Sequence, residues 1–138
     1  MDLIVADSSP LIALAYSGHI DVLLAIVHKL LITETVYQEC TSNAEMPGAI
    51  QIAAAVKDGR ITKVADPEIG DFRSIDGLDL GEALAIAQAK IMGAPILMDD
   101  AIGRQIAKAH GIAMIGSCGI LLAAKQRGCV HNVATRQD

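Results

Sequence analysis

Short apolar runs alternate along the chain with longer stretches in which apolar residues recur at helical spacing. Five of these runs are predicted to be strands. Residues 3–6 form a continuous apolar run, which is typical of a strand buried on both faces of a sheet. The others are residues 30–32, 61–65 (where apolar and polar residues alternate weakly), 95–98 and 112–115. The helical spacing predicts seven helices: residues 10–15, 20–27, 34–40, 47–56, 80–92, 102–109 and 120–127. This alternation predicts an α/β fold with a central parallel sheet covered on both faces.

Polar residues mark where several of these helices begin. Four side chains are suited to N-caps: Ser9 (followed by Pro10), Thr33, Asp79 and Ser117. Glu82 stands three residues after Asp79, which is the spacing of a capping box. Residues 66–79 form the one long loop-like stretch, and such loops are often functional. No linker or repeat divides the sequence, so residues 1–138 are expected to form a single domain.

Acidic residues directly follow two of the predicted strands. Asp7 follows the first strand, and Asp99 and Asp100 follow the fourth. Ligands of open parallel sheets bind outside the carboxyl ends of the strands, so these carboxylates are expected to meet at one edge. Glu82, at the start of one helix, and Glu39, at the border of the buried face of another, are candidates to join them.

Each of these carboxylates also has a purely structural explanation. Asp7 can bond to backbone amides in a turn, although a cap at Ser9 would leave Asp7 free to face the cleft. Glu82 can serve only as a member of the capping box. Glu39 can be an ordinary surface glutamate on its helix.

The pair Asp99 and Asp100 competes for one structural role, because one of the two is expected to cap the helix that follows. Asp100, Arg104 and Lys108 share a stripe of that helix at i, i+4 and i+8. Such a stripe can be a solvated row of ion pairs. It can equally place a metal ligand beside cations that contact phosphate.

Composition narrows the chemistry that these residues can perform. The formal net charge of −5 argues against a protein that coats nucleic acid by neutralising its backbone. Cys40, Cys118 and Cys129 lack a CxxC or His-paired spacing, so reduced thiols in a cytoplasmic protein are expected and a zinc site is not. Neither a signal peptide nor a membrane-spanning run is predicted. Carboxylates without a His cluster form an all-oxygen donor set, which favours Mg²⁺ or Mn²⁺.

Taken together, the motifs resemble those of PIN-domain proteins, the family that includes the ribonuclease toxins of toxin–antitoxin pairs. The resemblance covers nearly the whole chain in the right order, through these segments: Asp7-Ser8-Ser9-Pro10-Leu11-Ile12, Val36-Tyr37-Gln38-Glu39, Leu80-Gly81-Glu82-Ala83, Leu97-Met98-Asp99-Asp100 with Gly103-Arg104, and Gly116-Ser117-Cys118-Gly119-Ile120-Leu121. The last segment is similar to the end of one uncharacterised branch. Two positions depart from the family: Glu82 stands where Asp is commoner, and Met98 stands where the family usually has Thr.

The resemblance implies a three-layer α/β/α sandwich and a Mg²⁺- or Mn²⁺-dependent endoribonuclease. It implies that Asp7, Glu39, Glu82 and Asp100 are the catalytic acids. Asp7, Glu82 and Asp100 would hold the metal, and Glu39 would complete the shell or position water. Asp100 is chosen over Asp99 because the family's Thr-x-Asp aligns Met98 with the Thr; Asp99, Ser8 and Arg104 are second choices, with Asp99 as a helper or cap. An RNA substrate, a small antitoxin and a homodimer are the expected partners.

Three other functions share some of these features. A PIN-like module that binds RNA or protein without cutting would keep the fold and lack activity, and the acidic charge and Met98 favour it slightly. A receiver domain would need an acidic pair after the first strand, where only Asp7 stands. A dehalogenase-type phosphatase would need Asp-x-Asp there, which Asp7-Ser8-Ser9 does not supply.

Overall fold

The computed structural model describes residues 1–46, 48–73 and 75–128. Its five strands pair in the order β3-β2-β1-β4-β5, and every neighbouring pair is parallel. The strands are β1 (Leu3–Ala6), β2 (Lys29–Thr33), β3 (Ile61–Val64), β4 (Ile96–Leu97) and β5 (Met114–Ile115). The helices are α1 (Ser8–Tyr16), α2 (Ile20–Ile26), α3 (Glu34–Thr41), α4 (Ala49–Lys57), α5 (Leu80–Met92), α6 (Ala101–Ala109) and α7 (Ser117–Gln126), with a 3-10 turn, η1 (Gly70–Phe72).

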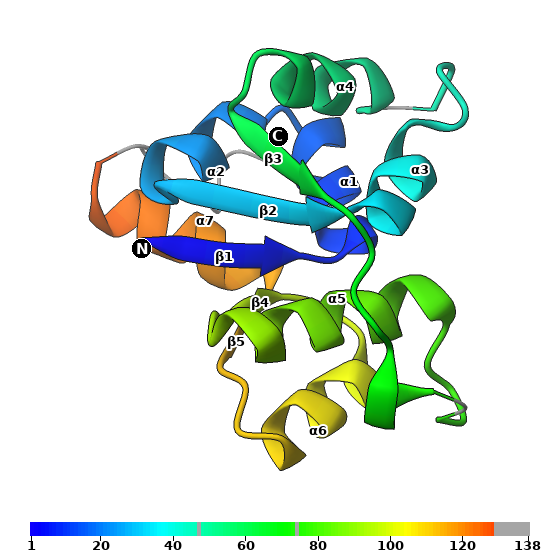
Figure 1. The fold of residues 1–138 in the computed structure, drawn as a ribbon. Helices are drawn as coiled ribbons and strands as arrows, with labels where there is room; N and C mark the ends of the chain where they lie inside the picture. Colours follow the sequence, from blue (N-terminus) through cyan, green and yellow to red (C-terminus); the bar gives the residue numbers. More distant parts are fainter. Residues whose placement is uncertain (47, 74, 129–138) are drawn as a thin grey trace.

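Helices cover the sheet in two layers, as the sequence predicts (Figure 1). α5 and α6 pack on one face, where α5 contacts β1, β2 and β4, and α6 contacts β5. α1, α2, α4 and α7 contact one another on the opposite side. α3 stands at the carboxyl ends of the strands, in contact with both α1 and α5. The fold is therefore a three-layer α/β/α sandwich.

The core is aliphatic, as the composition requires, because the central strands carry large apolar side chains on both faces. Ile4, Leu30, Ile96 and Leu97 are each at most 1 % exposed. Phe72 is the one aromatic side chain among the buried residues that the structure describes. No single described helix is long and apolar enough to span a membrane; α1 and α2 meet that test only as a pair bent by 118°.

Helix starts are where the structure corrects the sequence most often. α1 begins at Ser8 with Asp7 in the N-cap position, so the predicted cap at Ser9 is wrong. α7 begins at Ser117 itself, and Gly116 occupies its N-cap position. Thr33 caps α3 as predicted and accepts a hydrogen bond from the Val36 N–H at 3.1 Å. Pro47, predicted to open the fourth helix, lies outside the described residues, and α4 begins at Ala49.

Candidate active site

The sheet order places the candidate residues at its topological switch point. β1 lies between β2 and β4, so the direction of the strand order reverses between β1 and β4. In open α/β sheets, the carboxyl ends of strands at such a point border the binding crevice. Asp7 follows β1 there, and its backbone N–H donates to the Leu97 carbonyl of β4 at 2.9 Å. Asp99 and Asp100 follow β4 at the same edge.

Asp7 is buried in a way that a turn residue does not require. Its exposed fraction is 1 %, and Oδ1 has no hydrogen-bond partner among the described residues. Although Asp7 holds the N-cap position of α1, its side chain makes no capping hydrogen bond. The Ser8 N–H does bind the carboxylate, so that part of the structural explanation is confirmed. Oδ1 nevertheless remains without a partner, and the reason is not a cap at Ser9. A buried carboxylate oxygen without a partner is costly unless something else binds it.

Glu39 reaches the same edge from α3 and lies against the first turn of α5. A Cβ built on Gly81 would collide with both carboxylate oxygens of Glu39. Gly81 is buried, and its missing side chain provides the space that the carboxylate occupies. The positive end of a helix dipole also favours an anion at this point. Gly81 is therefore part of the site, a role that its place beside Glu82 in the sequence does not indicate.

Glu82 and Asp79 form the predicted capping box at the start of α5. The Glu82 N–H donates to Asp79 Oδ1 at 2.8 Å, and the Asp79 N–H donates to Glu82 Oε1 at 3.0 Å. The structural explanation of Glu82 is thus correct. It does not exclude a second role, because Glu82 Oε2 makes no hydrogen bond to a described residue. Asp79 was predicted only as a cap, yet its charge acts on Asp7, Glu39 and Glu82.

The two aspartates after β4 have different roles. Asp100 is the cap of α6, and its Oδ2 accepts from the Gly103 N–H at 2.7 Å. Asp99 does not cap that helix, contrary to the expectation that it was the likelier cap. It binds the first residue of α7 instead, accepting from the Ser117 N–H at 2.9 Å and from the Ser117 hydroxyl at 2.8 Å. Both oxygens of Asp99 are therefore engaged, whereas Asp100 has one left.

The shifted pKa values show that these carboxylates share one electrostatic environment. The pKa of Asp7 is raised to about 7, chiefly by burial; a hydrogen bond from the Ser8 backbone N–H partly offsets this rise, and the charges of Glu82, Glu39 and Asp79 add to it. Burial likewise raises the pKa of Glu39 and of Glu82, and the Asp79 charge adds to both effects. Asp100 and Glu39 also act on Glu82. The four predicted acids are thus brought together, with Asp79 as a fifth.

The remaining candidates border this acidic cluster. The Ser8 hydroxyl interacts with Glu39 and partly offsets the rise in the pKa of that carboxyl. Arg104 is exposed on α6, one turn after Asp100, and no ion pair joins it to a described residue, so the predicted row of ion pairs is not formed. Cys40 is 3 % exposed, and burial together with Glu39 and Asp7 raises the pKa of its thiol to about 12. Cys40 is therefore not a nucleophile.

The chemistry of the donor set fits a hard divalent cation, although the ligands are not preassembled. No three His, Cys, Asp or Glu side chains in the described part of the chain are arranged to hold one ion. Glu82 and Asp100 each use one oxygen to accept from a backbone N–H at a helix start and keep the other. Asp7 Oδ1, in contrast, is buried and has no partner among the described residues, which is the feature that a cation would complete.

Comparison with known proteins identifies the family of the chain and supports its fold. The family model DUF3368, described as a PIN domain, matches residues 3–136. The chain belongs to the PIN-domain family. A PilT N-terminus domain protein from the hyperthermophilic archaeon Sulfolobus solfataricus has a similar structure, with a TM-score of 0.52 and 18 % sequence identity over 90 % of this chain and 93 % of that one. At this identity the likeness shows the fold. No curated protein sequence matches the chain significantly.

PIN domains are generally nucleases that use divalent metal ions, and this membership supports a nuclease-like function for the chain. The edge that holds Asp7, Glu39, Glu82 and Asp100 is the part of this PIN domain that suits such chemistry. Met98 is a departure that the structure explains locally. Its side chain is fully buried, and its sulfur packs where a Cβ on Gly103 would stand, so an apolar contact takes the place of a hydroxyl.

Proposed function

We propose that this PIN domain is a Mg²⁺- or Mn²⁺-dependent endoribonuclease. The observation that carries the proposal is Asp7, a buried carboxylate with an unpartnered oxygen beside Glu39 and Glu82. A carboxylate kept in such surroundings opposes folding, so a role in binding a cation explains its presence better than a role in stability does. RNA rather than DNA is proposed from the resemblance of the motifs to those of ribonuclease toxins.

In the proposed mechanism, Asp7, Glu82 and Asp100 hold the cation, which would supply charge neutralisation and an activated water for phosphodiester hydrolysis. Asp7 is fixed by β1 and contributes the buried end of the site. Glu82 and Asp100 each use one carboxylate oxygen at a helix start, which leaves the other oxygen available to the cation. Glu39, placed over Gly81, positions water or completes the shell. Arg104 is exposed and available to contact a phosphate.

Cleavage of a labelled single-stranded RNA in Mn²⁺ tests this proposal. Asp7→Asn keeps the size of the side chain and removes its charge, so we expect it to abolish cleavage. Asp76→Asn, at an exposed acid of the long loop, is the matched control and should cut like the wild type. Equal cleavage by wild type and Asp7→Asn would show that the activity, if any, belongs to another site or to a contaminant.

A second candidate is a PIN-like module that binds RNA or protein and cuts weakly or not at all. Two observations favour it. Met98 places a buried apolar side chain where the family usually has a hydroxyl, and no three His, Cys, Asp or Glu side chains among the described residues are already arranged around a metal position. Calorimetry with Mn²⁺ separates the candidates. The nuclease should bind Mn²⁺ through Asp7, whereas a binding module without metal should bind RNA equally in EDTA.

Toxin function, an antitoxin partner, homodimerisation and a cytoplasmic location belong to the same proposal. Exposed apolar side chains support a protein partner: Tyr16 ends α1, and Met46 and Ile50 flank Gly48, which packs directly on the end of α1. Light scattering of the purified chain tests the homodimer. Growth arrest on induction, relieved by Asp7→Asn, tests the toxin role. Arrest that persists in Asp7→Asn would contradict a nuclease toxin.

A further inference from the structure

A pocket of about 660 Å³ lies beside the acidic cluster and shares none of its proposed metal ligands. It is formed between the long loop and the outer side of α5, and its lining includes Asp66, Glu68, Ile69, Arg73, Leu80 and Leu84. Leu80 is adjacent in sequence to Gly81, against which the Glu39 carboxylate lies. The pocket and the acidic cluster therefore both use residues of the first turn of α5.

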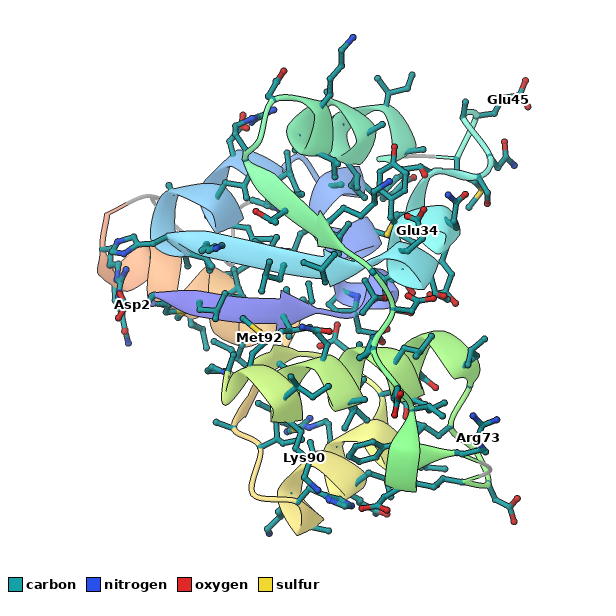
Figure 2. All side chains as sticks on the ribbon, in the orientation of Figure 1. Asp2, Glu34, Glu45, Arg73, Lys90 and Met92 are labelled. Carbon is teal, nitrogen blue, oxygen red and sulfur yellow. The ribbon has the colours of Figure 1, made fainter. Side chains whose placement is uncertain are left out.

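The loop wall of this pocket is held at both ends. At one end, both carboxylate oxygens of Asp66 bind Thr35 of α3, accepting from its N–H at 2.9 Å and from its hydroxyl at 2.6 Å. At the other end, Phe72 is 4 % exposed and packs on His110, with ring centroids 4.7 Å apart. Lys90, between α5 and α6 in Figure 2, lies over the same Phe72 ring. The loop that forms this wall is therefore held in place at both ends.

The polar side chains of the pocket differ in whether they are free to bind a ligand. Asp66 is fully used by Thr35, so its carboxylate is not available to a ligand. Glu68 is exposed and makes no hydrogen bond or ion pair to any described residue. Arg73 projects from the loop (Figure 2), is exposed, and likewise has no ion-pair partner in the described chain. The pocket therefore offers one free carboxylate and one free guanidinium.

Apolar side chains complete the lining. Leu80 is 60 % exposed at the first position of α5, and Leu84 lies one turn further along the helix. Exposed leucine beside polar groups is a surface on which a flat ring can pack, and binding sites for small ligands typically combine such apolar contacts with a few polar groups. A nucleobase presents a flat ring with a polar edge, and its phosphate would suit Arg73.

We propose that this pocket receives the base of a nucleotide next to the scissile phosphate and prefers guanine; this inference rests on the proposed ribonuclease function. Guanine presents two adjacent donors, N1–H and the N2 amino group, which match the two oxygens of the Glu68 carboxylate. Uracil presents one donor between two carbonyl oxygens, which the carboxylate repels. Cytosine and adenine each offer an amino donor beside an acceptor and are intermediate. Arg73 contacts the phosphate of the bound nucleotide.

Binding of nucleoside monophosphates, measured by NMR or calorimetry in EDTA, tests the pocket without any cleavage. We expect 5′-GMP to bind about tenfold more tightly than 5′-UMP, because a bidentate base contact typically discriminates by roughly 5- to 150-fold. Glu68→Gln should remove the preference. Arg73→Ala should weaken binding of GMP but leave guanosine, which has no phosphate, unchanged. Glu45→Gln is the matched control, since Glu45 is exposed on the loop beyond α3 (Figure 2).

Binding of all four nucleotides within twofold of one another would overturn the proposal, as would undetectable binding or an unchanged GMP preference in Glu68→Gln. The same measurements separate this proposal from the nuclease proposal. Selective GMP binding by a protein that cuts no RNA would refute the nuclease and support the pocket. Metal-dependent cleavage with no preference for guanosine next to the cut would refute the pocket alone.

Discussion

Replacing Asp7 with Asn should stabilise the metal-free protein at alkaline pH while it abolishes activity. Asp7 is buried, and its pKa is raised from 3.8 to about 7. The unfolded chain therefore releases this proton at lower pH than the folded chain does. Between pH 3.8 and about 7, wild-type stability falls as pH rises, and above pH 7 the full cost of the buried charge is present. Asn carries no charge and escapes this cost.

The size of the effect follows from the same two pKa values. The rise from 3.8 to about 7 corresponds to an upper value of about 4 kcal/mol, at about 1.4 kcal/mol per pKa unit. Relaxation around the new amide reduces the gain, so we expect about 2 kcal/mol at pH 8. For a chain of 138 residues, this corresponds to a rise in Tm of roughly 6–10 °C. At pH 4, the variant and the wild type should differ by well under 1 kcal/mol in this term.

Thermal and urea unfolding in EDTA at pH 4 and pH 8 measures the difference, with Asp76→Asn as the exposed-acid control. Added Mn²⁺ should reverse the order at pH 8, because ligand that binds only the folded state stabilises the wild type and not the variant. If Asp7→Asn is no more stable at pH 8, or gains equally at both pH values, then Asp7 is not a buried charge that opposes folding. If Mn²⁺ stabilises both proteins equally, Asp7 is not a ligand.

Three further substitutions test individual contacts of the site. Gly81→Ala should displace the Glu39 carboxylate and lower metal-dependent cleavage by about tenfold. Adding Glu39→Gln to this variant should then cause little further loss of cleavage. If the double variant shows the full additional loss, the displacement does not occur. Asp99→Ala removes the two hydrogen bonds to Ser117 and should lower the free energy of unfolding by about 1 kcal/mol. Its affinity for Mn²⁺, measured by calorimetry, should equal that of the wild type. A large fall in this affinity would show that Asp99 is a ligand. Met98→Thr should supply the hydroxyl that the family usually has here and raise turnover. Because it empties part of a buried core position, it should lower the free energy of unfolding by about 2 kcal/mol. A fall in turnover in a folded variant would show that the hydroxyl is not needed here.

The sequence predicts well those features that depend on neighbours along the chain. The capping box of Asp79 and Glu82 and the cap at Thr33 follow from residue type and spacing, and both are present. The order of strands and helices follows from apolar runs, and the acids after β1 and β4 then meet because parallel strands end together. The start of α1 was missed because Asp7, Ser8 and Ser9 are all good caps, and local pattern does not choose among them.

Features that depend on contacts across the fold were beyond the sequence. Nothing in the spacing of Gly81 and Glu39 indicates that a missing Cβ on α5 makes room for a carboxylate from α3. The bond from Asp99 to Ser117 joins residues 18 positions apart, and only the packing of β4 beside β5 brings them together. The burial of Asp7, which carries the functional argument, is likewise a property of the folded sheet. An acid after a strand would look the same in the sequence if it were exposed.

The two anchors of the long loop have an evolutionary consequence. Asp66 is hydrogen-bonded to Thr35 of α3, and the Phe72 ring packs between Lys90 of α5 and His110 at the end of α6. The residues between Asp66 and Phe72 therefore connect two fixed points. Ile69 packs against the core between these points, whereas Glu68 is exposed and can be substituted without moving the carboxylates of the acidic cluster. If the pocket binds a base as proposed, selection on Glu68 would change the preferred base while the acidic cluster stays the same.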